Sequence, residues 1–331
     1  MNADARDNPP TAAPAKRSTV GPYELVGLIG EGGFGEVWRA TATHTGPVAV
    51  KLFKPIASPD DVVARFRREA EAIAACKHPS IVRILDAQLT KVGQPYVVLE
   101  LVRGLPITDH CDAERMPIPE RLRVFADVCR AVDHAHRSGI IHGDLKPSNV
   151  LVSSTQPGHV PKIIDFGVAT ATGADPDAPP PGWLAGTPEY MSPEQAAASG
   201  AEADPQWDVY SLGCLLYELV TGKRPYHNDG LDMLSVWSLT RYLRELDPAD
   251  PSAWYHPGEP DSECRAALRG LDARHLAAVL ETKIGKLVAR SIAKDPHQRF
   301  RTAADLADAA TRTARKIERG GWSIDSLLQL V

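Results

Sequence analysis

Two short polar motifs constrain this chain more than any other feature of its sequence. Residues 142–149 read His-Gly-Asp-Leu-Lys-Pro-Ser-Asn, and residues 165–167 read Asp-Phe-Gly. Together they supply a carboxylate that can act as a base, a lysine that can meet a phosphate, and two oxygen ligands for a hard cation such as Mg²⁺. This is the polar inventory that phosphoryl transfer requires, because that reaction depends on positioning and on neutralising charge.

Composition and charge narrow the functional class. The formal net charge is −5, so no broad basic surface favours a nucleic acid as a partner, and none is expected. The five cysteines form no Cys-x-x-Cys pair, which indicates reduced thiols in a cytoplasmic protein. The sequence shows neither a signal peptide nor an apolar run long enough to cross a membrane, so we expect no membrane span.

The predicted strands gather in the first third of the chain. Short apolar runs, separated by turn residues, lie at 23–29, 37–42, 48–53, 81–87 and 96–102. One helix interrupts them, because Ser58 can cap a segment whose apolar residues Phe66, Ala70 and Ile73 share one face. These patterns predict a small sheet with one main helix.

Beyond Gly104 the pattern becomes helical. Residues 209–220 are apolar on nearly every side, which is typical of a central buried helix. We therefore predict an α+β fold in which a small β-rich lobe precedes a larger, mostly helical lobe. The expected ranges are 1–19 for a disordered N-terminal segment, 20–103 and 104–312 for the two lobes, and 313–331 for a C-terminal tail.

A glycine-rich stretch lies between two of the predicted strands. Residues 30–37 read Gly-Glu-Gly-Gly-Phe-Gly-Glu-Val, and their backbone can approach phosphates closely because the glycines carry no Cβ. Alone, the pattern is also consistent with a turn that has no function. Because Val37 opens a strand rather than a helix, the stretch favours a phosphate-binding hairpin over a dinucleotide-binding fold.

Taken together, the motifs resemble those of eukaryotic-type Ser/Thr protein kinases, especially bacterial members, over roughly residues 21–312. Val-Ala-Val-Lys at 48–51 resembles the third-strand motif of the family, and Lys-Pro-Ser-Asn at 146–149 resembles its Ser/Thr branch. The resemblance implies the bilobal kinase fold. It also implies transfer of the γ-phosphoryl group of ATP, with Mg²⁺ or Mn²⁺ as cofactor, to Ser or Thr hydroxyls of a protein substrate.

The resemblance implies roles for the residues of the two motifs. Asp144 would be the base that orients the substrate hydroxyl, and Lys146 would neutralise charge on the transferring phosphoryl group. Thr187 would contact both of them. Asn149 and Asp165 would bind the metal ion.

The resemblance also assigns the lysine of the third strand. Lys51 would contact the α- and β-phosphates and would pair with a glutamate of the predicted helix. Glu69 and Glu71 are the two candidates, and Glu69 lies nearer the apolar stripe of that helix. We therefore choose Glu69, and we interpret Glu71 as a solvated surface charge.

The remaining nucleotide contacts are likewise implied by the resemblance. Leu99 would be the gatekeeper, and the backbone of Glu100 and Val102 would bond the edge of the adenine. The other residues expected to bind the nucleotide are Ile29, Gly30, Gly32, Gly33, Gly35, Val37, Ala49 and Leu151. Ala49 and Leu151 are equally consistent with plain core positions.

Three further residues would support the chemistry without taking part in it. By resemblance, Glu194 would form a buried pair with Arg299, and Asp208 would anchor the backbone of the catalytic loop. Breaking a buried pair on one side typically costs about 3–5 kcal/mol. His142 is expected to pack rather than to react.

One residue departs from the family pattern. Gly143 stands where the family usually carries an Arg that bridges to a phosphate on the activation loop. Between residues 168 and 185 the only hydroxyls belong to Thr170 and Thr172. A phosphate on this loop would find no guanidinium at position 143, so we expect an enzyme that does not depend on phosphorylation there.

Two alternative functions stay open. A pseudokinase would bind nucleotide as a scaffold without turnover, although every catalytic residue is present. A small-molecule kinase of the aminoglycoside or choline type would share His-Gly-Asp, although Lys146 and the segment 186–194 argue against it. The long segment 225–294 either adds helices to the helical lobe or docks a partner through residues 228–276. A homodimer is a further alternative, because related bacterial kinases form homodimers.

Overall fold

The structure is a computed structural model that describes residues 18–32, 35–42, 46–54, 60–155, 158–166, 187–197, 203–226 and 236–319. Its internal contacts divide the chain into two compact units. Unit 1 comprises Met1–Pro55 and Leu85–Leu101, and unit 2 comprises Ile56–Ile84 and Val102–Val331. The lobe ranges and the terminal segments predicted from the sequence stay predictions.

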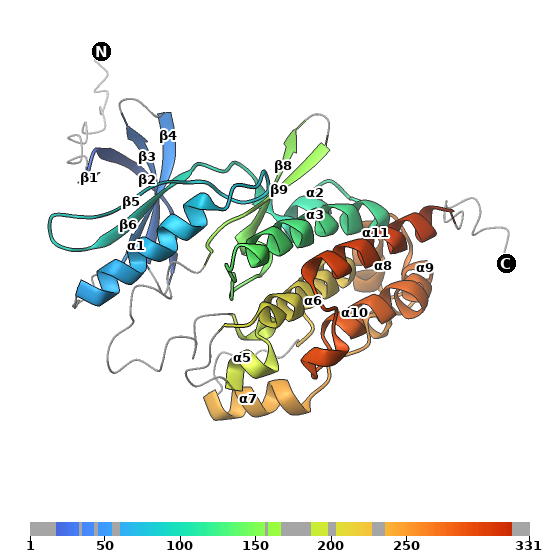
Figure 1. Ribbon diagram of the computed structural model, residues 1–331. Helices are drawn as coiled ribbons and strands as arrows, with labels where there is room; N and C mark the ends of the chain where they lie inside the picture. Colours follow the sequence, from blue (N-terminus) through green and yellow to red (C-terminus); the bar gives the residue numbers. More distant parts are fainter. Residues whose placement is uncertain are drawn as a thin grey trace, which may run out of the picture. The chain divides into compact units, whose positions relative to one another are not determined.

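Unit 1 is built on an antiparallel sheet with the strand order β1-β2-β3-β4-β6-β5 (Figure 1). The strands are β1 (Thr19–Val20), β2 (Tyr23–Gly32), β3 (Gly35–Ala42), β4 (Gly46–Phe53), β5 (Ile84–Leu89) and β6 (Pro95–Glu100). Val48, Val50 and Val98 on the central strands are almost completely buried in one core cluster. The β-branched residues of the sequence therefore occupy the middle of the sheet, where they pack best.

One predicted strand is shorter than expected. The run 81–87 was expected to be a strand throughout, but β5 begins only at Ile84. Ile81 instead forms an isolated parallel bridge with Ile163, and the N–H of Ile81 donates to the carbonyl of His78 at 3.1 Å. The backbone of Ile81 therefore pairs with Ile163, a distant pairing that the apolar pattern alone does not reveal.

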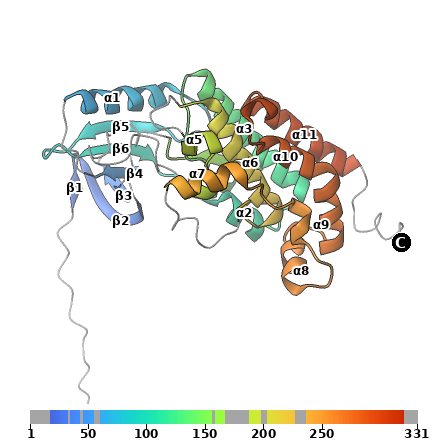
Figure 2. The ribbon, with the colours of Figure 1, turned by 90° about the horizontal axis from the view of Figure 1, so that it is seen from below.

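Unit 2 combines a small sheet with most of the helices (Figures 1 and 2). The sheet consists of β7 (Leu105–Pro106), β8 (Val150–Thr155) and β9 (Gly158–Ile163). The longer helices are α1 (Asp60–Ala75), α3 (Ile118–Arg137), α6 (Pro205–Thr221) and α11 (Ala303–Arg319). The shorter ones are α2 (Ile107–Ala113), α5 (Pro193–Ala197), α7 (Val236–Glu245), α8 (Pro260–Ala267), α9 (Ala273–Val279) and α10 (Gly285–Ser291).

Helix α6 is the central element of unit 2. Almost all of its residues are buried, and it packs against α3, α10 and α11. The Asp204 side chain accepts the N–H of Gln206 and caps its start, and Gly222 ends it in the left-handed conformation at φ +68°. The prediction of a buried helix at 209–220 is therefore confirmed, and this helix is the frame on which the catalytic loop is held.

Within the described ranges, none of the helices is both long and apolar enough to cross a membrane. Ser58, the expected cap of the helix that begins at Asp60, lies outside the described residues. So do Gly33 and Gly167, the segment with Thr170 and Thr172, and residues 228–235 of the segment expected to dock a partner.

Candidate active site

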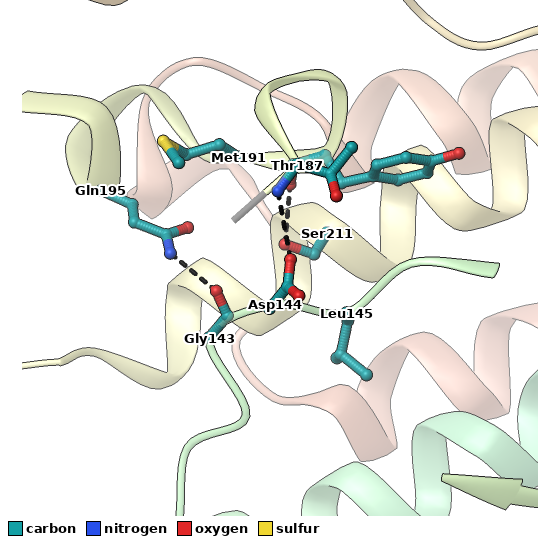
Figure 3. A pocket seen from close by; sticks show the side chains of 8 residues that line it. Gly143, Asp144, Leu145, Thr187, Met191, Gln195 and Ser211 are labelled. Atoms are coloured by element: carbon teal, nitrogen blue, oxygen red, sulfur yellow. Dashed lines mark hydrogen bonds between the residues drawn. The ribbon is translucent and has the colours of Figure 1, made fainter. Parts of the chain in front are cut away.

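The structure brings three of the predicted site residues together around the carboxylate of a fourth, Asp144. Lys146 Nζ donates to Asp144 Oδ2 at 2.8 Å and to Thr187 Oγ1 at 2.9 Å. The backbone N–H of Thr187 donates to Asp144 Oδ1 at 3.1 Å (Figure 3). Asn149 Nδ2 donates to Asp144 Oδ2 at 3.2 Å. Both oxygens of Asp144 are thus held, while 24% of its side chain stays exposed to meet a substrate.

The local sequence explains why Asp144 and Lys146 face the same way. Leu145 between them is fully buried, so the two polar neighbours are turned away from the core. Pro147 opens a short 3-10 turn, Pro147–Asn149, which closes when the N–H of Asn149 donates to the carbonyl of Lys146 at 3.0 Å. This turn brings Asn149 back against Asp144.

The backbone of Asn149 is bonded to Ile164, the residue before Asp165. The N–H of Ile164, next to Asp165, donates to the carbonyl of Asn149 at 2.9 Å. Asn149 Nδ2 faces two acceptors of Asp144, its carbonyl at 2.7 Å and its carboxylate, so Oδ1 is the atom left to coordinate a cation. One amide oxygen and one carboxylate make a hard donor pair, and phosphate oxygens and waters would complete the octahedral shell of Mg²⁺. The residues present fit this ion.

The backbone of Asp165 is strained. Its φ is +63°, a left-handed conformation that residues other than glycine rarely adopt and that costs about 1–2 kcal/mol. Strain of this kind clusters at functional sites, where the surrounding structure maintains it. Gly167, which follows two positions later, is outside the described residues.

A buried carboxylate on α6 binds the backbone of the catalytic loop, residues 142–149. Asp208 Oδ2 accepts the backbone N–H of His142, and its Oδ1 accepts the N–H of Gly143, both at 2.8 Å. His136 Nε2 is 2.7 Å from Oδ2. Burial alone would raise the pKa of Asp208, but the hydrogen bonds and the charge of His136 outweigh it and lower that pKa below its ordinary value. The anchoring role predicted for Asp208 is therefore present.

His142 packs under the loop, as expected. Its Nε2 is 2.9 Å from the carbonyl oxygen of Ile164, which can only accept, so Nε2 carries the proton. Its Nδ1 then accepts the backbone N–H of Asp144 at 3.2 Å. The imidazole also lies against the Phe166 ring, with 4.8 Å between the ring centroids. His142 thus connects the catalytic loop to the segment that carries Asp165.

Gly143 adopts a conformation that suits glycine. Its φ is +75°, while a Cβ built at this position would meet nothing within 4 Å. Backbone conformation, and not space, is therefore what a side chain at position 143 would disturb. The loop reaches this conformation with both of its first N–H groups already bonded to Asp208.

The ion pair predicted between Glu194 and Arg299 is bidentate. Arg299 Nη1 and Nη2 lie 2.5 and 2.7 Å from the two carboxylate oxygens of Glu194. Arg299 is buried and also donates to the carbonyls of Ala293, Lys294 and Gln206. Glu194 keeps 28% of its side chain exposed, so the pair is buried on the arginine side only. It fixes α5 to the end of the helical unit.

The predicted nucleotide-binding residues of unit 1 lie mainly on β2, β3, β4 and β6. Ala49 is buried, Lys51 is half-buried, and Ile29 is 53% exposed. Gly35 is required by packing, because a Cβ there would lie 1.9 Å from the carbonyl oxygen of Leu52. Glu69 is half-buried on α1 in unit 2, so its pairing with Lys51 stays a prediction, as do the roles of Leu99, Glu100, Val102 and Leu151.

Two polar contacts of the loop were missed by sequence reasoning. His136 contacts Asp208, as described above, and Gln195 Nε2 donates to the carbonyl oxygen of Gly143 at 2.7 Å (Figure 3). Each is a single polar residue outside the recognised motifs. Since the partner of Gln195 is a backbone atom far along the chain, no pattern of residue types pointed to it.

The first prediction concerns Gly143. We expect Gly143→Ala to lower the free energy of unfolding by about 1–2 kcal/mol, because alanine must adopt a left-handed backbone, and Gly143→Asn to cost less. Chemical denaturation measures both values. Gly27→Ala is the control, since its Cβ would also meet nothing within 4 Å but its φ is ordinary. Equal stability of the alanine variant and the native chain would contradict the conformational argument.

The second prediction concerns Asp208 and pH. Its pKa is lower in the folded chain than the ordinary 3.8, so its stabilising effect is present above that value and is lost as the pH falls through and below it. Asp208→Asn should therefore cost about 3 kcal/mol at pH 7, and less as the pH approaches 3.

Denaturation curves of Asp208→Asn and the native chain at a series of pH values measure this difference. Asp261→Asn serves as the control, because Asp261 is 72% exposed in its ion pair with Arg265 and should cost no more than about 1 kcal/mol. A difference that grows on acidification would show that the charge of Asp208 does not stabilise the loop.

Comparison with known proteins agrees with the geometry. Residues 23–309 match the family model described as protein kinase domain. The chain is 35% identical over 291 residues to the serine/threonine-protein kinase PknB of Mycobacterium leprae and to that of Mycobacterium tuberculosis, covering 86% of this chain and 42% and 41% of the relatives. It is 35% identical over 308 residues to PknA of Mycobacterium tuberculosis, covering 90% of this chain and 63% of PknA.

The chain thus spans less than two thirds of the length of these relatives. The β-rich sheet and the helical part fit the bilobal kinase fold, so the predicted fold class is confirmed. The chain therefore belongs to the protein kinase family, as a eukaryotic-type Ser/Thr kinase domain related to those of bacteria.

Proposed function

We propose that this domain transfers the γ-phosphoryl group of Mg²⁺-bound ATP to Ser or Thr hydroxyls of protein substrates. The observation that carries the proposal is the cluster of Lys146, Thr187 and Asn149 around Asp144. Phosphoryl transfer needs a base that faces the acceptor hydroxyl and a cation beside the transferred group. This cluster contains both, with the carboxylate and the ammonium 2.8 Å apart.

Each residue of the cluster has a distinct task in this proposal. Asp144 accepts the proton of the substrate hydroxyl and aims its oxygen at the phosphorus. Lys146 neutralises charge that develops on the phosphoryl oxygens, and Thr187 fixes the positions of both side chains. The oxygens of Asn149 and Asp165 hold the metal ion. Bound Mg²⁺, or Mn²⁺ in its place, supplies charge neutralisation for the nucleotide phosphates.

The glycine-rich stretch supports nucleotide binding. A Cβ at Gly30 or Gly32 would meet nothing within 4 Å, so packing inside the protein does not require glycine at either position. A backbone that approaches phosphate oxygens does require it. Gly35 differs, because its close contact with Leu52 already explains it. The two unexplained glycines therefore favour a phosphate ligand on β2.

Independence from activation-loop phosphorylation is part of the proposal. Position 143 carries no guanidinium that could bind a phosphate, while Asp208 holds the loop backbone through two N–H groups without one. The order of the catalytic loop then comes from α6. A homodimer, docking through residues 228–276 and a cytoplasmic location stay predictions from the sequence.

The third prediction tests turnover and residue type together. Incubation with labelled ATP, Mg²⁺ and a casein-like protein should place phosphate on Ser or Thr, as mass spectrometry would show. Asp144→Asn should lower kcat at least about 100-fold because the base is lost. Lys51→Met should also abolish labelling. Asp127→Asn, on an exposed side chain of α3, should leave activity unchanged.

Three outcomes of that assay would contradict the proposal. Nucleotide binding without any phosphate transfer would indicate a pseudokinase. Transfer to an aminoglycoside but not to protein would indicate a small-molecule kinase. An Asp144→Asn variant as active as the native chain would remove the proposed base.

The fourth prediction tests the activation loop. Replacing Thr170 and Thr172 together with Ala should leave kcat on the model substrate within about threefold of the native value, because no phosphate is needed there. A loss of about 100-fold or more, on the order of 2.7 kcal/mol of barrier, would refute independence from phosphorylation. Asp144→Asn in the same assay sets the level of an inactive enzyme.

A further inference from the structure

A buried glutamine contacts the catalytic loop beside the proposed base. Gln195 lies on α5, is 4% exposed, and donates from Nε2 to the carbonyl oxygen of Gly143 at 2.7 Å (Figure 3). The orientation of its amide is settled, because a carbonyl oxygen accepts only and must face the NH₂ group. The bonded carbonyl belongs to the peptide group that leads directly into Asp144.

The two peptide groups that flank Gly143 are therefore fixed from opposite partners. The N–H of Gly143 donates to Asp208 on α6, and its C=O accepts from Gln195 on α5. With both groups held, the backbone at Gly143 keeps its φ of +75° although glycine could adopt many others. We propose that Gln195 is a positioning residue that locks the Gly143–Asp144 peptide and so aims the Asp144 carboxylate. This inference rests on the proposed kinase function.

The helix that carries Gln195 is itself held by contacts on both sides of this residue. The backbone N–H of Gln195 donates to Ser192 Oγ at 3.1 Å, and Ser192 is fully buried. Glu194, the preceding residue, is held by the bidentate pair with Arg299. Because the helix around Gln195 is held by these contacts, a movement of the Gly143 backbone would have to break the hydrogen bond to Gln195. Gln195 therefore restrains the loop.

The surroundings of the bond strengthen it. The pocket in which it lies is lined by Gly143, Asp144, Leu145, Thr187, Tyr190, Met191, Gln195 and Ser211. Gln195 is 4% exposed, so its amide is largely shielded from solvent. A hydrogen bond from a buried amide is stronger than one at the surface, and removing the donor takes this partner away from the carbonyl oxygen of Gly143. Position 143 offers no side chain of its own that could compensate.

The fifth prediction compares two nearly isosteric replacements. Gln195→Met keeps the volume but removes the donor, so kcat should fall about tenfold while KM for ATP stays the same. Gln195→Glu can donate only while its carboxyl is protonated. The kcat of Gln195→Glu, divided by that of the native chain, should therefore rise toward one as the pH is lowered from about 8 to 5.5. The same ratio for Gln195→Met should not change with pH.

Dividing by the native kcat at each pH cancels the titration of groups common to all three chains. The charged groups on the elements that contact α5 and the loop include Asp144 with Lys146, Asp208, the pair of Glu194 with Arg299, and the exposed pair of Arg241 with Glu245 on α7. A second readout needs no turnover: in nucleotide-free protein, the Asp144 amide should exchange with deuterium faster in Gln195→Met than in the native chain. Melting temperatures confirm that both variants are folded.

The outcomes separate this inference from the proposed function. A native chain that transfers no phosphate defeats the proposed function, and the inference with it. An active native chain together with a fully active Gln195→Met, or a Gln195→Glu whose relative kcat follows that of Gln195→Met at every pH, overturns the inference alone. An unchanged exchange rate of the Asp144 amide would also overturn it.

Discussion

The buried carboxylate of Asp208 is the interaction on which the rest of the site depends. It is a charge taken fully out of water on the central helix, and that placement costs free energy unless the charge is well bonded. The N–H groups of His142 and Gly143 and the ring of His136 supply those bonds. The lowered pKa of Asp208 shows that these bonds outweigh the burial. The loop is tied to α6 as a result.

The contacts of the catalytic loop described above lie within unit 2. Asp144 is reached from its own loop by Lys146 and Asn149, and from the following segment by Thr187. Ion pairing of Glu194 with Arg299 steadies the helix that carries Gln195. Each of these contacts is made by groups of the unmodified chain. In the proposed mechanism the loop is therefore organised before any phosphate is added to the protein.

Sequence reasoning reached the motif residues because their motifs resemble those of a known family. The family resemblance implied the contacts of Thr187 with Asp144 and Lys146, and of Asp208 with the loop. The contacts of Gln195 and His136 were not predicted, because each is a single polar residue whose partner is determined by the tertiary structure. The left-handed backbone of Asp165 was not predicted either, since residue type does not predict strain. Ala49, equally consistent with core and ligand roles, is buried, and burial alone does not separate them.

In the proposed mechanism, Asp208 orders the catalytic loop without help from phosphorylation. Hydrogen exchange at the amides of His142 and Gly143 measures this most directly, in nucleotide-free protein before and after phosphatase treatment. We expect slow exchange at both amides in both samples, because both N–H groups are bonded to a buried carboxylate. Fast exchange in the dephosphorylated protein, slowed only once the activation loop carries phosphate, would contradict it.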